Sequence, residues 1–129
     1  MNSRLTTSFE TEKKIIELQR LLKLSTKAAV MRIAIGISLR VKPDPKKEFS
    51  ESNNDHGGAN YQRETIVGGE DELYKALIIE HAHRGIDEKE YFPELIGAHI
   101  ARGVNILYDE YQLKGNYDRV LDSILAMAG

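Results

Sequence analysis

Acidic side chains at helical spacing are the residues in this sequence that could most readily do chemistry. Asp118 and Asp122 stand four positions apart, and so do Glu90 and Glu94. Two carboxylates on one helix face can hold a divalent ion for phosphodiester chemistry. A nuclease usually needs three or more converging acids and a base, and no such set can be picked out. We therefore expect solvated helix faces and keep a metal-dependent nicking enzyme as an alternative.

The histidines and the absence of cysteine argue against other catalytic centres. His81 and His83 are two positions apart, so on a helix they point to roughly opposite sides and cannot share a metal ion. His99 flanks an apolar stripe, which is typical of a packing residue. Without cysteine the chain has no thiol nucleophile, zinc finger or thiolate-held iron–sulfur cluster. We expect no catalytic residue, no metal site and no cofactor.

The charge is distributed unevenly along the chain. Residues 1–47 hold eleven basic and four acidic side chains, a net charge of +7, whereas residues 48–129 hold seven basic and sixteen acidic ones, a net charge of −9. A basic front part suggests a polyanion as its partner. The alternative is that the two regions neutralise each other across an interface within one chain or between subunits.

The elements that would carry this basic part follow a recognisable order. Residues 4–9 predict a short strand with Arg4, Thr6 and Ser8 on one side. Residues 10–23 have the apolar period of an amphipathic helix, and Ser25 is a good N-cap for a second helix over residues 26–40. Strand, helix, Ser/Thr break and helix is the order of a ribbon-helix-helix module, in which strands of two subunits pair and face DNA.

The second helix is apolar on almost every side, so it must be covered all round. In so short a chain we expect a second copy of the protein to cover it, and hence a homo-oligomer. The residues beyond it predict a flexible connection over 42–69 and three helices in an acidic part, residues 70–129, at about 70–84, 93–113 and 117–127. The expected fold is mainly α, a single domain over 1–129, with 1–41 as its ribbon-helix-helix-like part.

DNA backbone is the polyanion that such a front part would contact. The candidate phosphate-binding residues are the side chains of Arg4, Lys13, Lys14, Arg20, Lys23, Lys27, Lys42, Lys46 and Lys47. The backbone amides at Ser25 and Thr26, which open the second helix, would bind a further phosphate. Lysines act as point charges, so we expect weak sequence specificity, steep salt dependence, and loss of binding when Lys23 and Lys27 are reversed to Glu.

Several segments of the chain resemble one known family. They are Arg4–Ser8, Leu24–Ala29, Ile35–Leu39, Gly69–Leu77 and His99–Gly103. In these segments the sequence is similar to DndE, the small subunit of the bacterial DNA phosphorothioation system. The resemblance implies a homo-oligomer, with a tetramer as its expected form, that binds double-stranded DNA, including nicked duplex, and acts with the other subunits of the sulfur-modification complex.

The resemblance and the residues together predict a non-catalytic DNA-binding subunit. Sulfur transfer needs thiolates, which this chain lacks, so the chemistry would belong to other chains. A ribbon-helix-helix transcriptional regulator and a pure protein-interaction subunit are the alternatives besides the nicking enzyme. Residues 1–20 have no apolar signal core, and no apolar stretch is long enough to span a bilayer, so we expect a cytoplasmic protein without a membrane partner.

Overall fold

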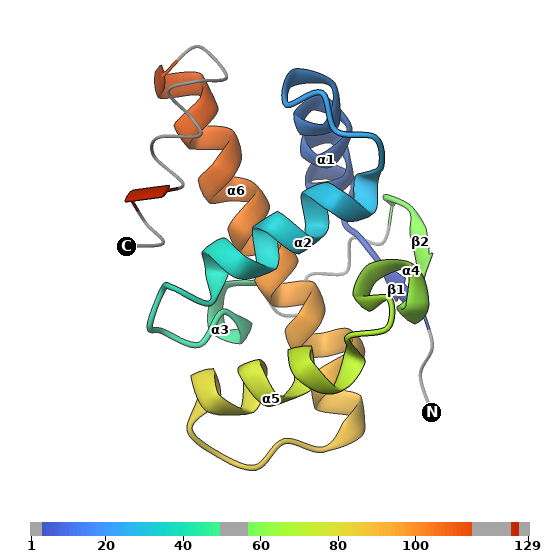
Figure 1. The fold of residues 1–129 in the computed structure, drawn as a ribbon, viewed down its shortest axis with the longest axis vertical. Helices are drawn as coiled ribbons and strands as arrows, with labels where there is room; N and C mark the ends of the chain where they lie inside the picture. The colour runs from blue at the N-terminus through green and yellow to red at the C-terminus, as the bar shows by residue number, and fades with distance from the viewer. Residues whose placement is uncertain (1–3, 50–56, 115–124, 127–129) are drawn as a thin grey trace.

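The computed structural model describes residues 4–49, 57–114 and 125–126, and its fold is mainly helical, as predicted. The elements are, in chain order, β1 (Arg4–Thr6), α1 (Phe9–Leu21), α2 (Lys27–Ser38), α3 (Lys46–Phe49), β2 (Asn60–Gln62), α4 (Arg63–Val67), α5 (Asp71–Ala82), η1 (Glu90–Leu95) and α6 (Ile96–Lys114). Figure 1 shows α6 running the length of the molecule, with α2 crossing it and α5 at the opposite end from α1. None of the described helices combines the length and apolar character needed to cross a membrane.

Helix α1 begins where the sequence predicts and ends slightly earlier. The hydroxyl of Ser8 accepts a hydrogen bond from the Thr11 amide (3.1 Å) and so caps the helix. Ser8 therefore serves the helix start and does not extend the strand, which ends at Thr6. The helix buries Ile15 and Leu18, and its continuation is broken at Lys23, whose φ of 57° lies in the left-handed region.

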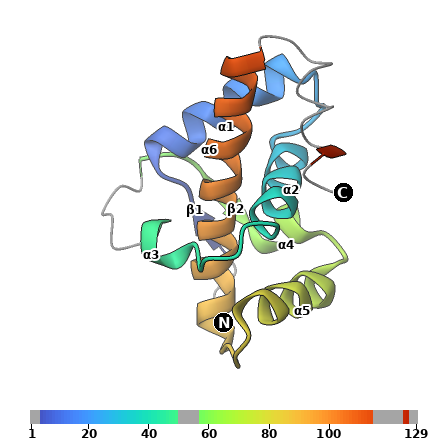
Figure 2. The ribbon, with the colours of Figure 1, turned by 90° about the vertical axis from the view of Figure 1, so that its left-hand side faces the viewer.

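Helix α2 is covered within the single chain. Its side chains Val30, Met31, Ala34 and Ile35 are fully buried, and the helix packs against α1, α4 and most extensively α6. The expectation that a second copy must cover this helix is therefore wrong, because the later part of the chain folds back over it (Figure 2). Its N-cap is Thr26, which accepts from the Ala29 amide (3.1 Å), and not Ser25.

The closest approach between α2 and α6 is at Gly103. A Cβ atom built there would lie 1.9 Å from the carbonyl oxygen of Ala34, so only glycine fits. At Gly97, by contrast, a Cβ would lie 3.4 Å from the Leu5 side chain, which is an ordinary contact. Ile96, Ile100 and Leu107 form the buried stripe of α6.

The N-terminal strand pairs within its own chain. β1 runs antiparallel to β2, with Leu5 opposite Tyr61, and Leu5 is buried while Arg4 and Thr6 are exposed. The alternation is as predicted, but the pairing strand is β2, not the strand of a second copy. Residues 42–69 accordingly contain α3, β2 and α4, so the expectation of a connection without regular structure is wrong for these elements. The predicted helix over 117–127 lies outside the described residues, apart from 125–126, which are helical.

A buried carboxylate joins β1, α1, α2 and β2. Glu12 accepts hydrogen bonds from the hydroxyls of Thr7 (2.8 Å) and Tyr61 (2.7 Å to Oε2), and from the ammonium of Lys27 (3.0 Å). Burial, and then the carboxylate beside it, raise the pKa of the Tyr61 phenol, which therefore stays a donor. Glu12 thus holds the strand pair against the two helices.

A second buried polar cluster fastens the end of α2 to α6. Arg102 donates to the Ser38 hydroxyl (2.9 Å) and to the backbone carbonyls of Ser38, Val41 and Pro43. The Ser38 hydroxyl also forms a hydrogen bond with Nδ1 of His99 (2.8 Å). The other ring nitrogen, Nε2, is buried and has no hydrogen-bond partner among the described residues.

His99 is expected to make the protein sensitive to mild acid. Burial, and next the neighbouring His81 and Arg102, lower the pKa of His99 to about 3, against an ordinary value of 6.5. The unfolded chain therefore takes up a proton below pH 6.5 that the folded protein refuses until about pH 3, so stability falls as the pH drops through this window. Denaturant midpoints measured at pH 7.5 and at pH 5 should show this loss.

The matched variants are His99→Gln and His83→Asn. His83 is an exposed helix cap with a left-handed φ of 58°, a conformation that asparagine tolerates. We expect His99→Gln to reduce the loss between pH 7.5 and 5, and His83→Asn to keep the wild-type dependence. An unchanged dependence in His99→Gln would contradict the prediction.

Candidate nucleic-acid interface

Three of the predicted phosphate-binding residues share the outer side of α1 and the turn after it. Lys13 and Arg20 are exposed and seven positions apart, which places them on one face of the helix about 10 Å apart along its axis. Lys23 follows in the turn and is also exposed. Arg20 forms a surface ion pair with Glu17, which a phosphate could replace at little cost because both side chains are solvated. We call Lys13, Arg20 and Lys23 the basic edge.

The start of α2 continues this edge. Ser25 and Thr26 are both exposed and come directly after Lys23 and Leu24 in the chain. Thr26 satisfies the Ala29 amide with its own hydroxyl, so the amides of the first turn that precede Ala29 are those that would face a phosphate. The predicted pair of hydroxyl residues and the basic edge are therefore neighbours in the fold.

Lys14 and Lys27 have partners inside the protein. The ammonium of Lys14 donates to Asn105 of α6 (2.7 Å) and lies 5.3 Å above the centre of the Tyr108 ring. Lys27 is bound to the buried Glu12. Both side chains were predicted to contact phosphate, and the structure instead uses them to hold α1 against α6 and against α2.

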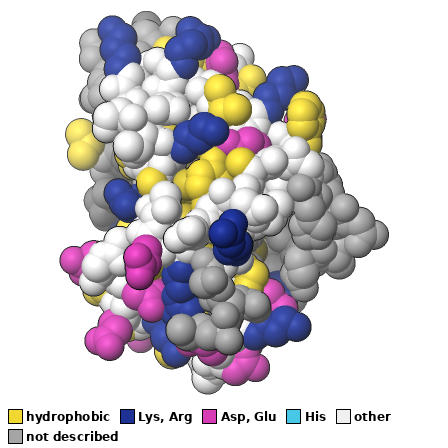
Figure 3. All heavy atoms as spheres, turned by 90° about the vertical axis from the view of Figure 1, so that its right-hand side faces the viewer, with side chains coloured by type: hydrophobic (Ala, Val, Ile, Leu, Met, Phe, Trp, Pro, Cys, Tyr) yellow, Lys and Arg dark blue, Asp and Glu magenta, His cyan; other side chains and the backbone are white. Residues whose placement is uncertain are grey.

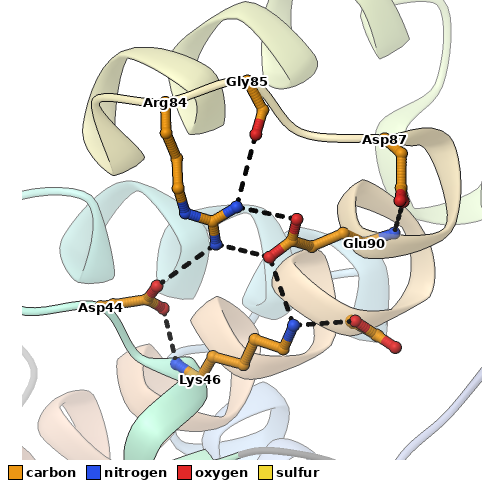
Figure 4. A network of polar contacts seen from close by, with 7 residues as sticks. Asp44, Lys46, Arg84, Gly85, Asp87 and Glu90 are labelled. Carbon is orange, nitrogen blue, oxygen red and sulfur yellow. Dashed lines mark hydrogen bonds and ion pairs between the residues drawn. The ribbon is translucent and has the colours of Figure 1, made fainter.

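Lys46 joins the basic front of the chain to its acidic back. Its ammonium lies 3.2 Å from a carboxylate oxygen of Glu90 and 3.1 Å from one of Glu94. Figure 4 shows Lys46 and Arg84 meeting at Glu90, and Asp44 is 3.6 Å from Arg84. The Arg84 guanidinium, and next the Lys46 ammonium, lower the pKa of Glu90 to about 2 despite its burial. Lys46 is therefore held by two carboxylates of the acidic part, which is the alternative of mutual neutralisation at this residue, and its assignment to DNA stays a prediction.

The same network bears on the suggestion that Glu90 and Glu94 could hold a divalent ion. Glu90 and Glu94 do not share a regular helix face, because the backbone is non-helical at Phe92 between them, and the ammonium that both carboxylates contact is that of Lys46. No group of three metal-ligating side chains occurs among residues 4–49 and 57–114 or at 125–126. Asp118 and Asp122 lie outside the described residues, as does the side chain of Lys47.

The remaining predicted cations lie apart from the basic edge. Arg4 is exposed on β1. Lys42 is exposed after the end of α2, and the helix, about 18 Å long, separates it from the basic edge at the start of α2. Arg40, which was not singled out as a site residue, is exposed beside Lys42, and its place two positions earlier in the sequence was the available signal. Figure 3 shows the side of the molecule that lies at the right in Figure 1, where Lys and Arg side chains stand out in the upper part among a few acidic ones and the two signs lie interleaved in the lower part.

A shallow hollow lies between α1 and α6, next to the basic edge. It encloses about 290 Å³ and is lined by Glu10, Lys13, Lys14, Glu17 and Tyr108. Two carboxylates and two ammonium groups balance each other there, so the hollow is not selective for an anion. The cationic surface is therefore the outer side of α1 and not this hollow.

Comparison with known proteins identifies the family. The family model described as "DNA sulphur modification protein DndE" matches residues 4–115, which is most of the chain. The chain belongs to the DndE family. The resemblance seen in the sequence is thereby confirmed.

A solved DndE structure has the same fold as this DndE-family chain. The crystal structure of DndE from Escherichia coli B7A, described as involved in DNA phosphorothioation modification, superposes with a TM-score of 0.62 at 17% sequence identity. The match covers 83% of this chain and 98% of the other. Among curated proteins no sequence matches.

Proposed function

We propose that this DndE-family protein is a non-catalytic DNA-binding subunit of the DNA phosphorothioation machinery. The observation that carries this proposal is the basic edge, where Lys13, Arg20 and Lys23 are exposed beside the exposed start of α2. Ammonium and guanidinium groups at this spacing fit phosphates of a duplex backbone. The family description indicates the DNA phosphorothioation pathway. The positive charge of the basic edge indicates DNA as the ligand.

Binding through phosphates has a signature that distinguishes it from the reading of a base sequence. The affinity should fall linearly with salt on a logarithmic scale, with a slope of about −0.9 for each phosphate contacted, and so about −3 for the three side chains of one protomer. The measurement is fluorescence anisotropy at several salt concentrations on intact, nicked and scrambled duplexes. A strong preference for one base sequence would contradict the proposal and favour a sequence-specific transcriptional regulator.

Charge reversal at the basic edge is the decisive variant. Lys13→Glu with Lys23→Glu is preferable to a variant containing Lys27→Glu, because Lys27 is bound to the buried Glu12 and its reversal would disturb the fold. Each lost contact costs roughly tenfold near 0.1 M salt, so we expect the double variant to bind on the order of 100-fold more weakly. Its salt slope should also become shallower by about 2.

The matched control for this variant is Lys89→Glu, which reverses an exposed lysine in the acidic part of the chain. The control should bind DNA almost as tightly as the wild type. Equal binding by the wild type and the double variant, with both folded by circular dichroism, would remove the assignment of the basic edge.

We also propose that the subunit acts as a homo-oligomer, with a tetramer as the expected form, together with the other subunits of the sulfur-modification complex. Since α2 is covered within the chain, contacts between copies must use apolar side chains exposed elsewhere. Phe9 and Ile16 of α1 are more than half or half exposed and suit such a contact. Sedimentation of wild type and of Phe9→Ser with Ile16→Ser tests this, and a monomeric wild type would contradict it.

A further inference from the structure

Helix α5 exposes much more apolar surface than a helix of a folded domain normally leaves in water. Of its large apolar side chains only Ile78 is buried, while Leu73, Leu77 and Ile79 are 53%, 41% and 37% exposed. Leu73 and Leu77 are four positions apart and form one ridge, with the exposed Ala76 beside them. Figure 1 and Figure 2 both place the helix at the outside of the molecule, at the end away from α1.

The exposed charges that α5 itself carries on this side are acidic. Glu80 lies between Ala76 and Leu73 in angular position, and Glu72 lies beside Ile79. The lysine of the helix, Lys75, is turned to the other side, where its ammonium lies 3.0 Å from Glu88. We call Leu73, Ala76, Leu77 and Ile79, together with Glu72 and Glu80, the α5 face.

We propose that the α5 face binds a basic amphipathic helix of another protein. Its leucines would be desolvated by apolar side chains of the partner, and its carboxylates would pair with lysine or arginine at the edge of the contact. DNA does not fit this face, because phosphates would meet Glu72 and Glu80. Two copies of α5 do not fit each other either, because a parallel pair brings each carboxylate against its counterpart and an antiparallel pair brings Glu72 of one helix against Glu80 of the other.

This surface goes beyond the proposed function. The basic edge lies at the α1 end of the molecule and the α5 face at the other (Figure 1), so one protomer can hold a duplex and a basic protein segment at the same time. The two surfaces have opposite charge and therefore do not compete for one ligand.

The test uses two designed peptides of about four helical turns. Both carry leucine along one stripe, with lysine on both sides of it in the first peptide and glutamate in the second. We expect the wild-type protein to bind the lysine peptide at least about tenfold more tightly than the glutamate peptide. Leu73→Ser with Leu77→Ser should weaken binding of the lysine peptide by about tenfold or more, and Glu72→Lys with Glu80→Lys should reverse the preference.

The control is Leu113→Ser, which removes an exposed apolar side chain from α6 and should leave peptide binding unchanged. The proposal is overturned if the wild type binds neither peptide, if it binds both equally, or if the leucine variant binds as well as the wild type. It is also overturned if Leu73→Ser with Leu77→Ser dissociates a wild-type oligomer in sedimentation, because the face then contacts a second copy. DNA affinity is measured on the same variants and should not change, so this failure is distinct from failure of the DNA proposal.

Discussion

Replacing Gly103 by alanine is expected to destabilise the protein by about 3 kcal/mol. The added Cβ would lie 1.9 Å from the Ala34 carbonyl oxygen and also within 2.6 Å of that residue's Cα. These are backbone atoms of α2 and cannot swing aside as a side chain would, so the two central helices must move apart and lose contact along their length. Urea denaturation followed by circular dichroism measures the loss.

The control for Gly103→Ala is Gly36→Ala in α2. Gly36 is exposed, and a Cβ atom there meets nothing within 4 Å, so alanine should raise stability by about 0.5–1 kcal/mol through its better helix propensity. The two substitutions are chemically identical and are expected to have opposite signs. A Gly103→Ala protein as stable as the wild type would show that α2 and α6 do not approach each other as described.

Replacing Glu12 by glutamine is expected to cost about 3–4 kcal/mol. The carboxylate binds Thr7, Tyr61 and Lys27, and an amide can neither accept from all of these donors nor balance the lysine charge. The Lys27 ammonium is partly solvated, which keeps the cost below that of a fully buried pair. Unfolding by urea gives the loss, and the variant should also protect the β1 amides less well from hydrogen exchange.

Glu17→Gln is the comparison for Glu12→Gln. Glu17 lies on the same helix and pairs with Arg20, but both side chains are solvent-exposed, so the change should be about 0.5 kcal/mol or less. Lys27→Met is then added to the Glu12→Gln and the Glu17→Gln variants. Its effect on the free energy of unfolding should be large in the Glu17→Gln variant, which keeps Glu12, and small in the Glu12→Gln variant. If both glutamine variants lowered the free energy of unfolding equally, Glu12 would not be the residue that holds the strand pair against α1 and α2.

The elements were predictable where side-chain periodicity is strong and local. The apolar period of residues 10–23 and the stripe of Ile96, Ile100 and Leu107 follow from contacts within one or two helical turns, whereas the cap of α2 lies at Thr26, one residue after the predicted Ser25. The alternation of β1 was likewise visible in three residues. These features depend on the neighbours of each residue in the sequence.

The partners of these elements were not predictable in the same way. β1 pairs with a strand more than fifty positions later, and neither three-residue segment contains a pattern that would identify its partner. The apolar composition of α2 correctly indicated that it must be covered, but composition cannot distinguish a second copy from the chain's own later helices.

The candidate site shows the same division. Exposure of Lys13 and Arg20 followed from the helix period, because these residues lie opposite the buried stripe, whereas Lys23 is exposed in the turn after the helix. Lys46 has the same chemistry but lies against Glu90 and Glu94, and this contact spans more than forty positions. A count of charges along the sequence therefore overestimates the exposed positive charge, because it includes basic side chains that are paired with carboxylates in the folded protein.

The packing of α2 beneath α6 has a consequence for synthesis of the protein. About 60 residues separate the end of α2 from the start of α6, and at roughly 5–20 residues per second a ribosome needs several seconds to add them. During that interval the nascent chain presents Val30, Met31 and Ile35 without their later cover. Messenger RNAs truncated before the codons of α6 should therefore yield aggregated protein. Chaperones should release the nascent chain only during the final third of translation.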